Sequence, residues 1–327
     1  MIRRTRIGSG WAAALIVTFV AGCDNVDWGG ADIAVVPPPP GATPGDEGTA
    51  PREERLPEGP IVYYVTPDAG GPTIRPIAEI GRDTLLPVAP RVDPEAYGRS
   101  FIATHMRTGT EFALFRRGAR VGTFILSEAG LPPENVCPRV PIGRGVLELM
   151  PGADTIPEFL ALSKSHAPPD APLGVPAELQ PDRRMQILGP ILAERLLRAR
   201  GAPLPGNWTR AMAQLKPFPM AGEQDPAFAA TFLVGDSLGI GLDNDGYSLF
   251  MIAEPRPQVG YDTAYASFTP YEREGKAAPR VVDYLDWDRN GQAELLLEVY
   301  GTDRSWFETV SAAPGGGWRK QVSTRCR

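Results

Sequence analysis

The chain has 327 residues and a formal net charge of −6, with 36 prolines and 36 glycines. An acidic chain lacks the charge that binds nucleic acid or an anionic lipid surface, so we expect neither partner. Proline and glycine at this frequency interrupt helices too often for a helical bundle. They favour short strands joined by turns, so we expect a mainly β (α+β) fold.

The first 22 residues have the pattern of a secretory signal peptide. Three arginines precede an uncharged run from Trp11 to Gly22, which is shorter than the roughly 20 residues that span a bilayer. The run ends in Val20-Ala21-Gly22-Cys23, which resembles the lipobox of bacterial lipoproteins. That resemblance implies lipidation of Cys23 and a membrane anchor in the bacterial cell envelope, facing the periplasm or the surface. The alternative is a plain signal peptide with Cys23 as an incidental thiol.

Residues 23–59 form a Pro/Gly-rich segment that includes four consecutive prolines, Pro37 to Pro40. The segment has too few apolar residues to offset the entropy of ordering it, so we expect a lipidated, disordered tether. Removal of residues 1–22 would lower the net charge from −6 to −9, because they contain three arginines and no acidic residue.

Strand patterns begin after the tether. Apolar residues dominate or alternate in Ile61–Val65, Thr73–Ile80 and Val146–Met150. Residues 111–126 alternate on both sides of a basic turn at Arg116–Arg120 and predict a β-hairpin. We expect these strands to form a small barrel or sandwich over residues 60–165. The basic turn is predicted to be a solvated tip, with a ligand contact as the alternative.

A Pro-rich linker, residues 166–220, is predicted next and contains the one clear helix, over 182–200. Asp182 precedes apolar residues at helical spacing, and Gly201 provides a C-terminal stop. Pro190 lies inside this pattern and is expected to kink or split the helix, because proline removes a backbone donor.

The last segment, residues 221–327, has the pattern of two hairpins. One spans Phe232–Ile252 and the other spans Val281–Tyr300. Each is expected to turn at a cluster of acidic and amide side chains, at residues 243–246 in the first hairpin and 286–291 in the second.

Two cysteines remain once Cys23 is lipidated, Cys137 and Cys326. In an oxidising compartment an even pair of cysteines favours a disulfide, so we expect these two to be bonded. Two separate buried thiols are the alternative, which the position of Cys326 one residue from the chain end disfavours.

The turn of the second hairpin has the composition of a cation loop. Its candidate ligands are the side chains of Asp286, Asp288, Asn290 and Glu294 and the backbone carbonyl of Gln292, with Gly291 allowing a sharp turn. Oxygen donors of this kind are what a hard cation such as Ca²⁺ prefers. An EF-hand would need a carboxylate at the twelfth position, where Leu297 stands. The alternative is a polar turn in which the carboxylates only cap backbone N–H groups.

The pattern of residues 286–294 instead resembles the calcium loop of FG-GAP or VCBS repeats, the modules of integrin-type β-propellers. The resemblance extends from Arg280 to the C-terminus and implies a calcium loop that joins two strands. Asp243-Asn244-Asp245-Gly246 resembles a degraded second copy that lacks the final acid. Two hairpins are too few for the four to eight blades of a propeller, so we expect a repeat-like module and not a full propeller.

A serine motif provides the rival hypothesis. Gly235-Asp236-Ser237-Leu238-Gly239 matches the nucleophile elbow and the opening motif of GDSL-type esterases. Those families place a histidine base after the serine, whereas both histidines here precede Ser237. Carboxylate pairs such as Glu272 and Glu274 would be needed for a glycosidase, and solvated carboxylates are the simpler interpretation.

Together these features predict an envelope lipoprotein that acts as a non-catalytic binding or scaffolding module with a structural Ca²⁺ loop. Its partners would be the membrane, through the lipid anchor, and an envelope protein or glycan. Trp287, Trp306 and Trp318 would suit a glycan surface, although aromatic residues in strands usually lie in a core. The rival is a cell-envelope hydrolase that uses Ser237 or a carboxylate pair.

Overall fold

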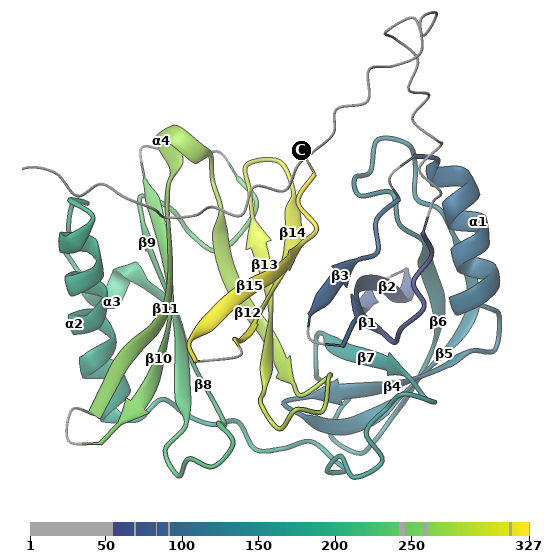
Figure 1. Cartoon of the computed structure of the whole chain (residues 1–327), viewed down its shortest axis with the longest axis horizontal. Coiled ribbons are helices and arrows are strands. Elements are labelled where there is room, and N and C mark those ends of the chain that lie inside the picture. Colours follow the sequence, from purple (N-terminus) through teal and green to yellow (C-terminus); the bar gives the residue numbers. More distant parts are fainter. Residues whose placement is uncertain are drawn as a thin grey trace, which may run out of the picture. The chain divides into compact units, whose positions relative to one another are not determined.

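A computed structural model describes residues 55–326 except for positions 69, 83, 91, 242–245, 258–259 and 314–315. The predicted signal peptide, the predicted lipidation site Cys23, most of the predicted tether and residues 243–245 of the predicted first acidic turn lie outside the described residues. Residues 51–327 form one compact unit. It is mainly β, with fifteen strands and four helices in the described part of the chain (Figure 1).

The N-terminal half of this unit is a closed β-barrel, which is one of the two architectures that the sequence predicts. Six antiparallel strands follow one another in the order β1-β7-β4-β5-β6-β2, and pairing of β1 with β2 closes the ring. A short strand, β3, extends β2 beyond the ring. The bounds are β1 Ile61–Asp68, β2 Gly71–Ile80, β3 Leu85–Pro87, β4 Glu111–Arg116, β5 Ala119–Gly130, β6 Ile142–Leu149 and β7 Phe159–Ser163.

Alternation along the strands separates the inside of the barrel from its outer face. In β1, Ile61, Tyr63 and Val65 belong to the interior core, whereas Val62 and Tyr64 belong to a second cluster outside the ring. Helix α1, Pro94–His105, covers the barrel and adds Tyr97 and Phe101 to the interior core (Figure 1). The prediction of a single helix missed α1.

The C-terminal half contains two four-stranded antiparallel sheets. One has the order β11-β10-β9-β8 and the other the order β12-β13-β14-β15. The first sheet begins at Met212, inside the segment predicted to be a linker, because β8 pairs with β9. The bounds are α3 Trp208–Ala211, β8 Met212–Phe218, β9 Ala227–Val234, β10 Tyr247–Arg256, β11 Gly260–Pro270, α4 Tyr271–Glu274, β12 Ala278–Leu285, β13 Glu294–Tyr300, β14 Ser305–Ala312 and β15 Trp318–Ser323.

Helix α2, Arg183–Ala199, is the helix that the sequence predicts. The Asp182 side chain accepts a hydrogen bond from the backbone of Met185 and caps its start. Gly201 has φ of +64°, and the amide of Ala202 bonds back to the carbonyl of Leu197, which is a Schellman ending. The helix is not split at Pro190, because the apolar face on either side of the proline is held against the first sheet.

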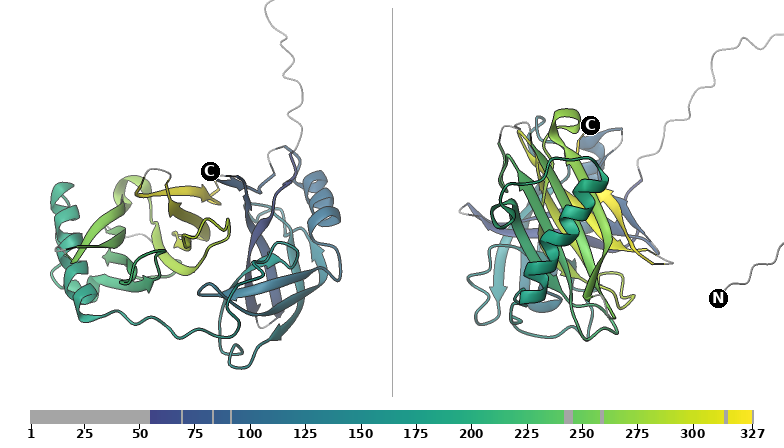
Figure 2. Two further views of the ribbon diagram at one scale, coloured as in Figure 1. Left: turned by 60° about the horizontal axis from the view of Figure 1, so that its bottom comes forward. Right: turned by 90° about the vertical axis from the view of Figure 1, so that its left-hand side faces the viewer.

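The sheet β12–β15 is covered on both faces. Leu295, Leu297 and Val299 pack toward the sheet β8–β11, whereas the alternate residue Leu296 packs toward the outer face of the barrel. Helix α2 packs on the opposite face of β8–β11 (Figure 2). Both faces of the sheet β12–β15 are covered. The strands β12 and β13 are therefore buried at nearly every position and lack the alternate solvent-facing residues of a one-sided sheet. Trp287, Trp306 and Trp318 are all buried in these cores, so they do not form an exposed glycan surface.

Candidate functional site

The predicted cation loop joins β12 to β13, as the sequence indicates. Two residues adopt the left-handed backbone conformation, Arg289 at φ +62° and Gly291 at φ +86°. This conformation turns the chain tightly enough for both ends of the loop to approach each other. Three of the predicted ligands, Asp286, Asp288 and Glu294, come together with one oxygen from each within 4.8 Å of the others.

Backbone amides of the same loop hold these carboxylates in place. Asp286 accepts from the amides of Asn290 and Gly291, each at 3.0 Å. Asp288 also accepts from the Asn290 amide, at 3.1 Å, and Glu294 accepts from the amide of Trp287, at 3.0 Å. The carboxylates are therefore fixed by local hydrogen bonds, as the turn-capping alternative requires, and at the same time converge on one point.

The electrostatics of the loop disfavour three ionised carboxylates. Glu294 is 1% exposed. Burial, together with the charge of Asp288, raises its pKa to about 9, and burial also raises the pKa of Asp286. In the part of the chain that the structure describes, no lysine, arginine or histidine forms an ion pair with Asp286, Asp288 or Glu294. The cluster is therefore an uncompensated acidic site whose charge a cation or a proton would neutralise.

The predicted ligand Asn290 is placed differently from the three carboxylates. The Asn290 side chain directs its amide nitrogen to Asp288 at 3.0 Å and to Glu294 at 3.4 Å, while its oxygen accepts from the Gln292 amide at 2.7 Å. The structure thus brings the three carboxylates together and leaves the Asn290 oxygen outside the cluster. Rotation of this amide by half a turn would exchange its two ends.

The loop also contacts the first half of the chain. Trp287 is 4% exposed and packs in the cluster between the sheet β12–β15 and the barrel. The Arg289 guanidinium donates to the backbone carbonyl of His166 at 2.6 Å. The loop is therefore joined by a direct hydrogen bond to the segment that follows β7.

The basic turn of the β4–β5 hairpin is not a solvated tip, so that prediction is wrong. The side chains of Arg116 and Arg117 are 11% and 14% exposed. The Arg117 amide donates to both carboxylate oxygens of Asp283 on β12, at 3.1 and 3.0 Å, and Arg116 lies 3.7 Å from the same carboxylate. The tip is buried because a fully buried acid on another element binds it. Nothing in the local sequence of the hairpin identifies that partner.

A second charged group connects the barrel to β12 and β13. Arg280 makes a bidentate pair with Glu158, with both distances 2.7 Å, and a third contact with Glu298 at 2.7 Å. Tyr64 donates to Glu158 at 3.0 Å. Burial would raise the pKa of Glu158, but the hydrogen bonds and charge of Arg280 outweigh burial and hold it below its usual value. This ion pair stays charged at neutral pH.

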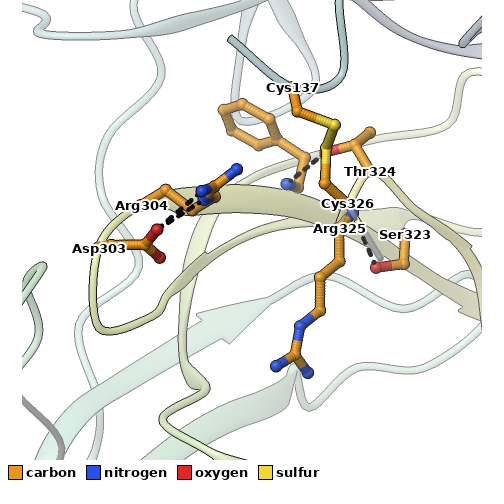
Figure 3. The surroundings of a disulfide bond; sticks show 8 residues. Cys137, Asp303, Arg304, Ser323, Thr324, Arg325 and Cys326 are labelled. Atoms are coloured by element: carbon orange, nitrogen blue, oxygen red, sulfur yellow. Dashed lines mark hydrogen bonds and ion pairs between the residues drawn. A yellow bond between two sulfur atoms is a disulfide. The ribbon is translucent and has the colours of Figure 1, made fainter. Parts of the chain in front are cut away.

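The structure contains the predicted disulfide between Cys137 and Cys326, whose Cα atoms are 5.9 Å apart (Figure 3). The bond joins the loop that precedes β6 to the chain segment after β15. Thr324, beside it in Figure 3, accepts a hydrogen bond from the Phe307 amide at 2.9 Å. Separate buried thiols, the alternative prediction, are not observed.

Ser237 lies at the wall of a cavity beside β9 and α3, away from both histidines. His105 contacts the backbone of Pro57, and His166 contacts the hydroxyl of Ser163. The neighbouring Asp236 is held by Lys276 and therefore does not orient a base. Glu272 is exposed on α4. The residues that the structure describes do not assemble a nucleophile, base and acid around Ser237.

The chain matched no protein-family model, no curated protein and no solved structure in comparisons with each. Among the described residues, no helix combines the length and the apolar character needed to cross a bilayer.

Proposed function

We propose that this chain is a lipid-anchored envelope protein whose folded part is a non-catalytic binding or scaffolding module, and that the loop at 286–294 holds a structural Ca²⁺. The observation that carries the calcium proposal is the convergence of Asp286, Asp288 and the buried Glu294, to none of which a cationic side chain of the described residues is paired. A buried carboxylate without a compensating charge is unfavourable, and a bound cation provides that charge.

The donor set suits a hard cation. Asp286, Asp288 and Glu294 offer carboxylate oxygens from a loop between two antiparallel strands, which is also the placement implied by the resemblance to FG-GAP or VCBS repeats. Calcium takes six to eight oxygen ligands, so backbone carbonyls and water would complete the set. In this proposal the ion stabilises the loop and its contact with the segment after β7, and takes no part in a reaction.

The binding or scaffolding role is supported by the rigid connection of the barrel to the two sheets. Buried ion pairs and a disulfide fix the barrel and the two sheets within one compact unit. The rival hydrolase would need a base beside Ser237, and neither histidine lines the cavity that contains this serine. Labelling of the chain by a serine-reactive probe, lost in Ser237→Ala, would establish the rival and refute the non-catalytic role.

Thermal melts of the full chain test the calcium loop. At about 100 times the dissociation constant, calcium should raise the free energy of unfolding by roughly 2.7 kcal/mol relative to a chelator. Asp288→Ala removes one ligand and should abolish this increase, whereas the control Asp303→Ala, an exposed acid outside the loop, should keep it. Equal wild-type midpoints with calcium and with chelator would mean that the carboxylates are only turn-formers.

Detergent phase partition tests the anchor. Acyl chains on Cys23 would carry the chain into the detergent phase, because a multiply acylated cysteine binds membranes stably. Cys23→Ser should give an uncut or water-soluble form. Identical processing and partition of wild type and Cys23→Ser would refute lipidation at this residue.

A further inference from the structure

A cavity of about 1040 Å³ lies beside the Gly235–Gly239 motif, which the proposed function leaves without a role. Its wall includes Ser237, Asp236 and Lys276, together with Arg210 of α3. The volume is near the upper end of the range of small-molecule sites, which is about 300–1,000 Å³. The question is which ligand chemistry the groups at this wall would recognise.

The wall contains a buried ion pair. Lys276 and Asp236 have side chains that are 2% and 6% exposed, and their charged atoms are 2.6 Å apart. Tyr271 donates to the second oxygen of Asp236 at 3.0 Å and so fixes the carboxylate. Burying two charges is unfavourable unless their hydrogen-bonding capacity is used, so a buried ion pair contributes little net stability. Its position at a cavity wall therefore suggests a role in binding.

Lys276 has hydrogen-bonding capacity left at the cavity. An ammonium group has three donors, and Asp236 is the one acceptor that the Lys276 ammonium contacts among the described residues. A Cβ atom placed on Gly241, which also lines the cavity, would lie 4.0 Å from the ammonium nitrogen. Among the described residues, the buried ammonium therefore keeps two donors that Asp236 does not use.

The rest of the wall adds donors and apolar surface. Arg210 is exposed and is not part of any ion pair in the described part of the chain, and the Ser237 hydroxyl is a further donor. Apolar residues, Leu233, Leu238 and Ile240, line the same cavity, and Ile240 is 57% exposed. The charged residues of the described wall are two cations and one anion, although the chain as a whole is acidic.

We propose that this cavity binds a small organic anion, with its carboxylate or phosphate group between Lys276, Arg210 and Ser237 and its apolar part against Leu238 and Ile240. An oxyanion accepts several hydrogen bonds at once and is favoured by a local excess of positive charge. Asp236 holds the ammonium of Lys276 in place instead of acting as an acid or base. This proposal is independent of the calcium loop and would stand if that loop bound no ion.

Saturation-transfer NMR on the full chain tests this site with three probes of equal alkyl length. Hexanoate should receive saturation from the protein, whereas hexanol and hexylammonium should receive at least threefold less. Arg210→Gln and Ser237→Ala should each weaken the hexanoate signal at least threefold. The matched control Arg99→Gln, an exposed arginine on α1, should leave it unchanged. Equal signals from hexanoate and hexylammonium, or an unchanged signal in Arg210→Gln, would overturn the proposal.

A competition arm separates the two sources of such an anion. Displacement of hexanoate by phosphatidylglycerol vesicles supports a lipid headgroup as the ligand, and displacement by inorganic phosphate alone supports a free small anion. Displacement by uncharged detergent micelles to the same extent would count against the site, because it would show that only the alkyl chain is recognised.

Discussion

Asp283 has no exposed surface and receives hydrogen bonds from the amides of Arg117 and Tyr284. Burial raises its pKa, while the nearby charges of Arg116 and Lys216 oppose that effect. Removing one member of such a buried group leaves the other members uncompensated, and that is what makes a single substitution severe.

We expect Asp283→Asn to lower the free energy of unfolding by about 3–5 kcal/mol, because Lys216 would lose a buried counter-charge and Arg116 would keep only Glu158 as a partner. The control Asp262→Asn replaces an acid that is 57% exposed and 3.9 Å from Arg195, so it should change stability by less than about 1 kcal/mol. Urea unfolding of both variants measures the difference. Equal midpoints would show that Asp283 does not hold the hairpin tip.

Glu294 gives the folded chain a distinct dependence on pH. Its pKa of about 9 in the folded state lies above the ordinary value of 4.5, so at neutral pH the folded state keeps a proton that the unfolded chain has lost. The stability from this proton is fully present below the ordinary pKa and is lost as pH rises toward the folded value. The slope is at most about 1.4 kcal/mol per pH unit.

With chelator present, the urea midpoint of the wild type should therefore fall between about pH 5 and pH 9. Glu294→Gln cannot release this proton, so its midpoint should fall less over the same range. A wild-type midpoint with the same pH dependence as that of Glu294→Gln would contradict the assignment.

At the scale of single elements, helix α2 is stopped by a residue whose backbone conformation favours glycine. Gly201 at φ +64° adopts a conformation that other residues reach only with strain, so Gly201→Ala should destabilise the chain by about 1 kcal/mol. Gly206→Ala is the control, because Gly206 has open space around it and no left-handed φ. Urea midpoints compare the two, and an equal effect of both would show that backbone conformation is not the cause.

Elements with local signals were predictable from sequence. The hairpin over residues 111–126 has an apolar run on each side of a glycine-containing turn, and α2 has both a cap and a stop. Helix α1 was missed because it contains Gly98, which weakens a helical pattern. Gly98 is there because a Cβ at this position would lie 2.6 Å from the side chain of Leu131, a contact that appears only in the folded chain.

The candidate loop was predictable for the same local reason, because its carboxylates lie within nine residues. What the sequence does not reveal are its distant contacts. Burial of the Arg117 tip depends on Asp283, which is 166 positions away along the chain. Strand β8 was assigned to the linker because its seven residues include Pro217 and two polar or charged residues, Gln214 and Lys216. Pairing with β9 decides its conformation.

For the whole molecule, the disulfide Cys137–Cys326 closes a sequence separation of 189 residues. In the loop-entropy picture its removal should lower the free energy of unfolding by about 2–5 kcal/mol, because the unfolded chain regains freedom. Urea unfolding of Cys137→Ser/Cys326→Ser against wild type measures this. Addition of reductant should lower the wild-type midpoint and leave that of the double variant unchanged. An equal loss in both proteins would show that the reductant acts elsewhere than on this disulfide.

The sheet β12–β15 has a neighbour on each face, which limits how the gene for such a chain can recombine with others. A gene fragment that encoded the barrel alone would produce a protein with Tyr64, Phe115 and Leu160 facing water, since these outward residues are buried together with the sheet. A fragment that encoded the sheets alone would expose Leu296 and Phe307 in the same way. Exchange of either half without its partner would expose an apolar face, so recombination should favour breakpoints before residue 51, outside the compact unit.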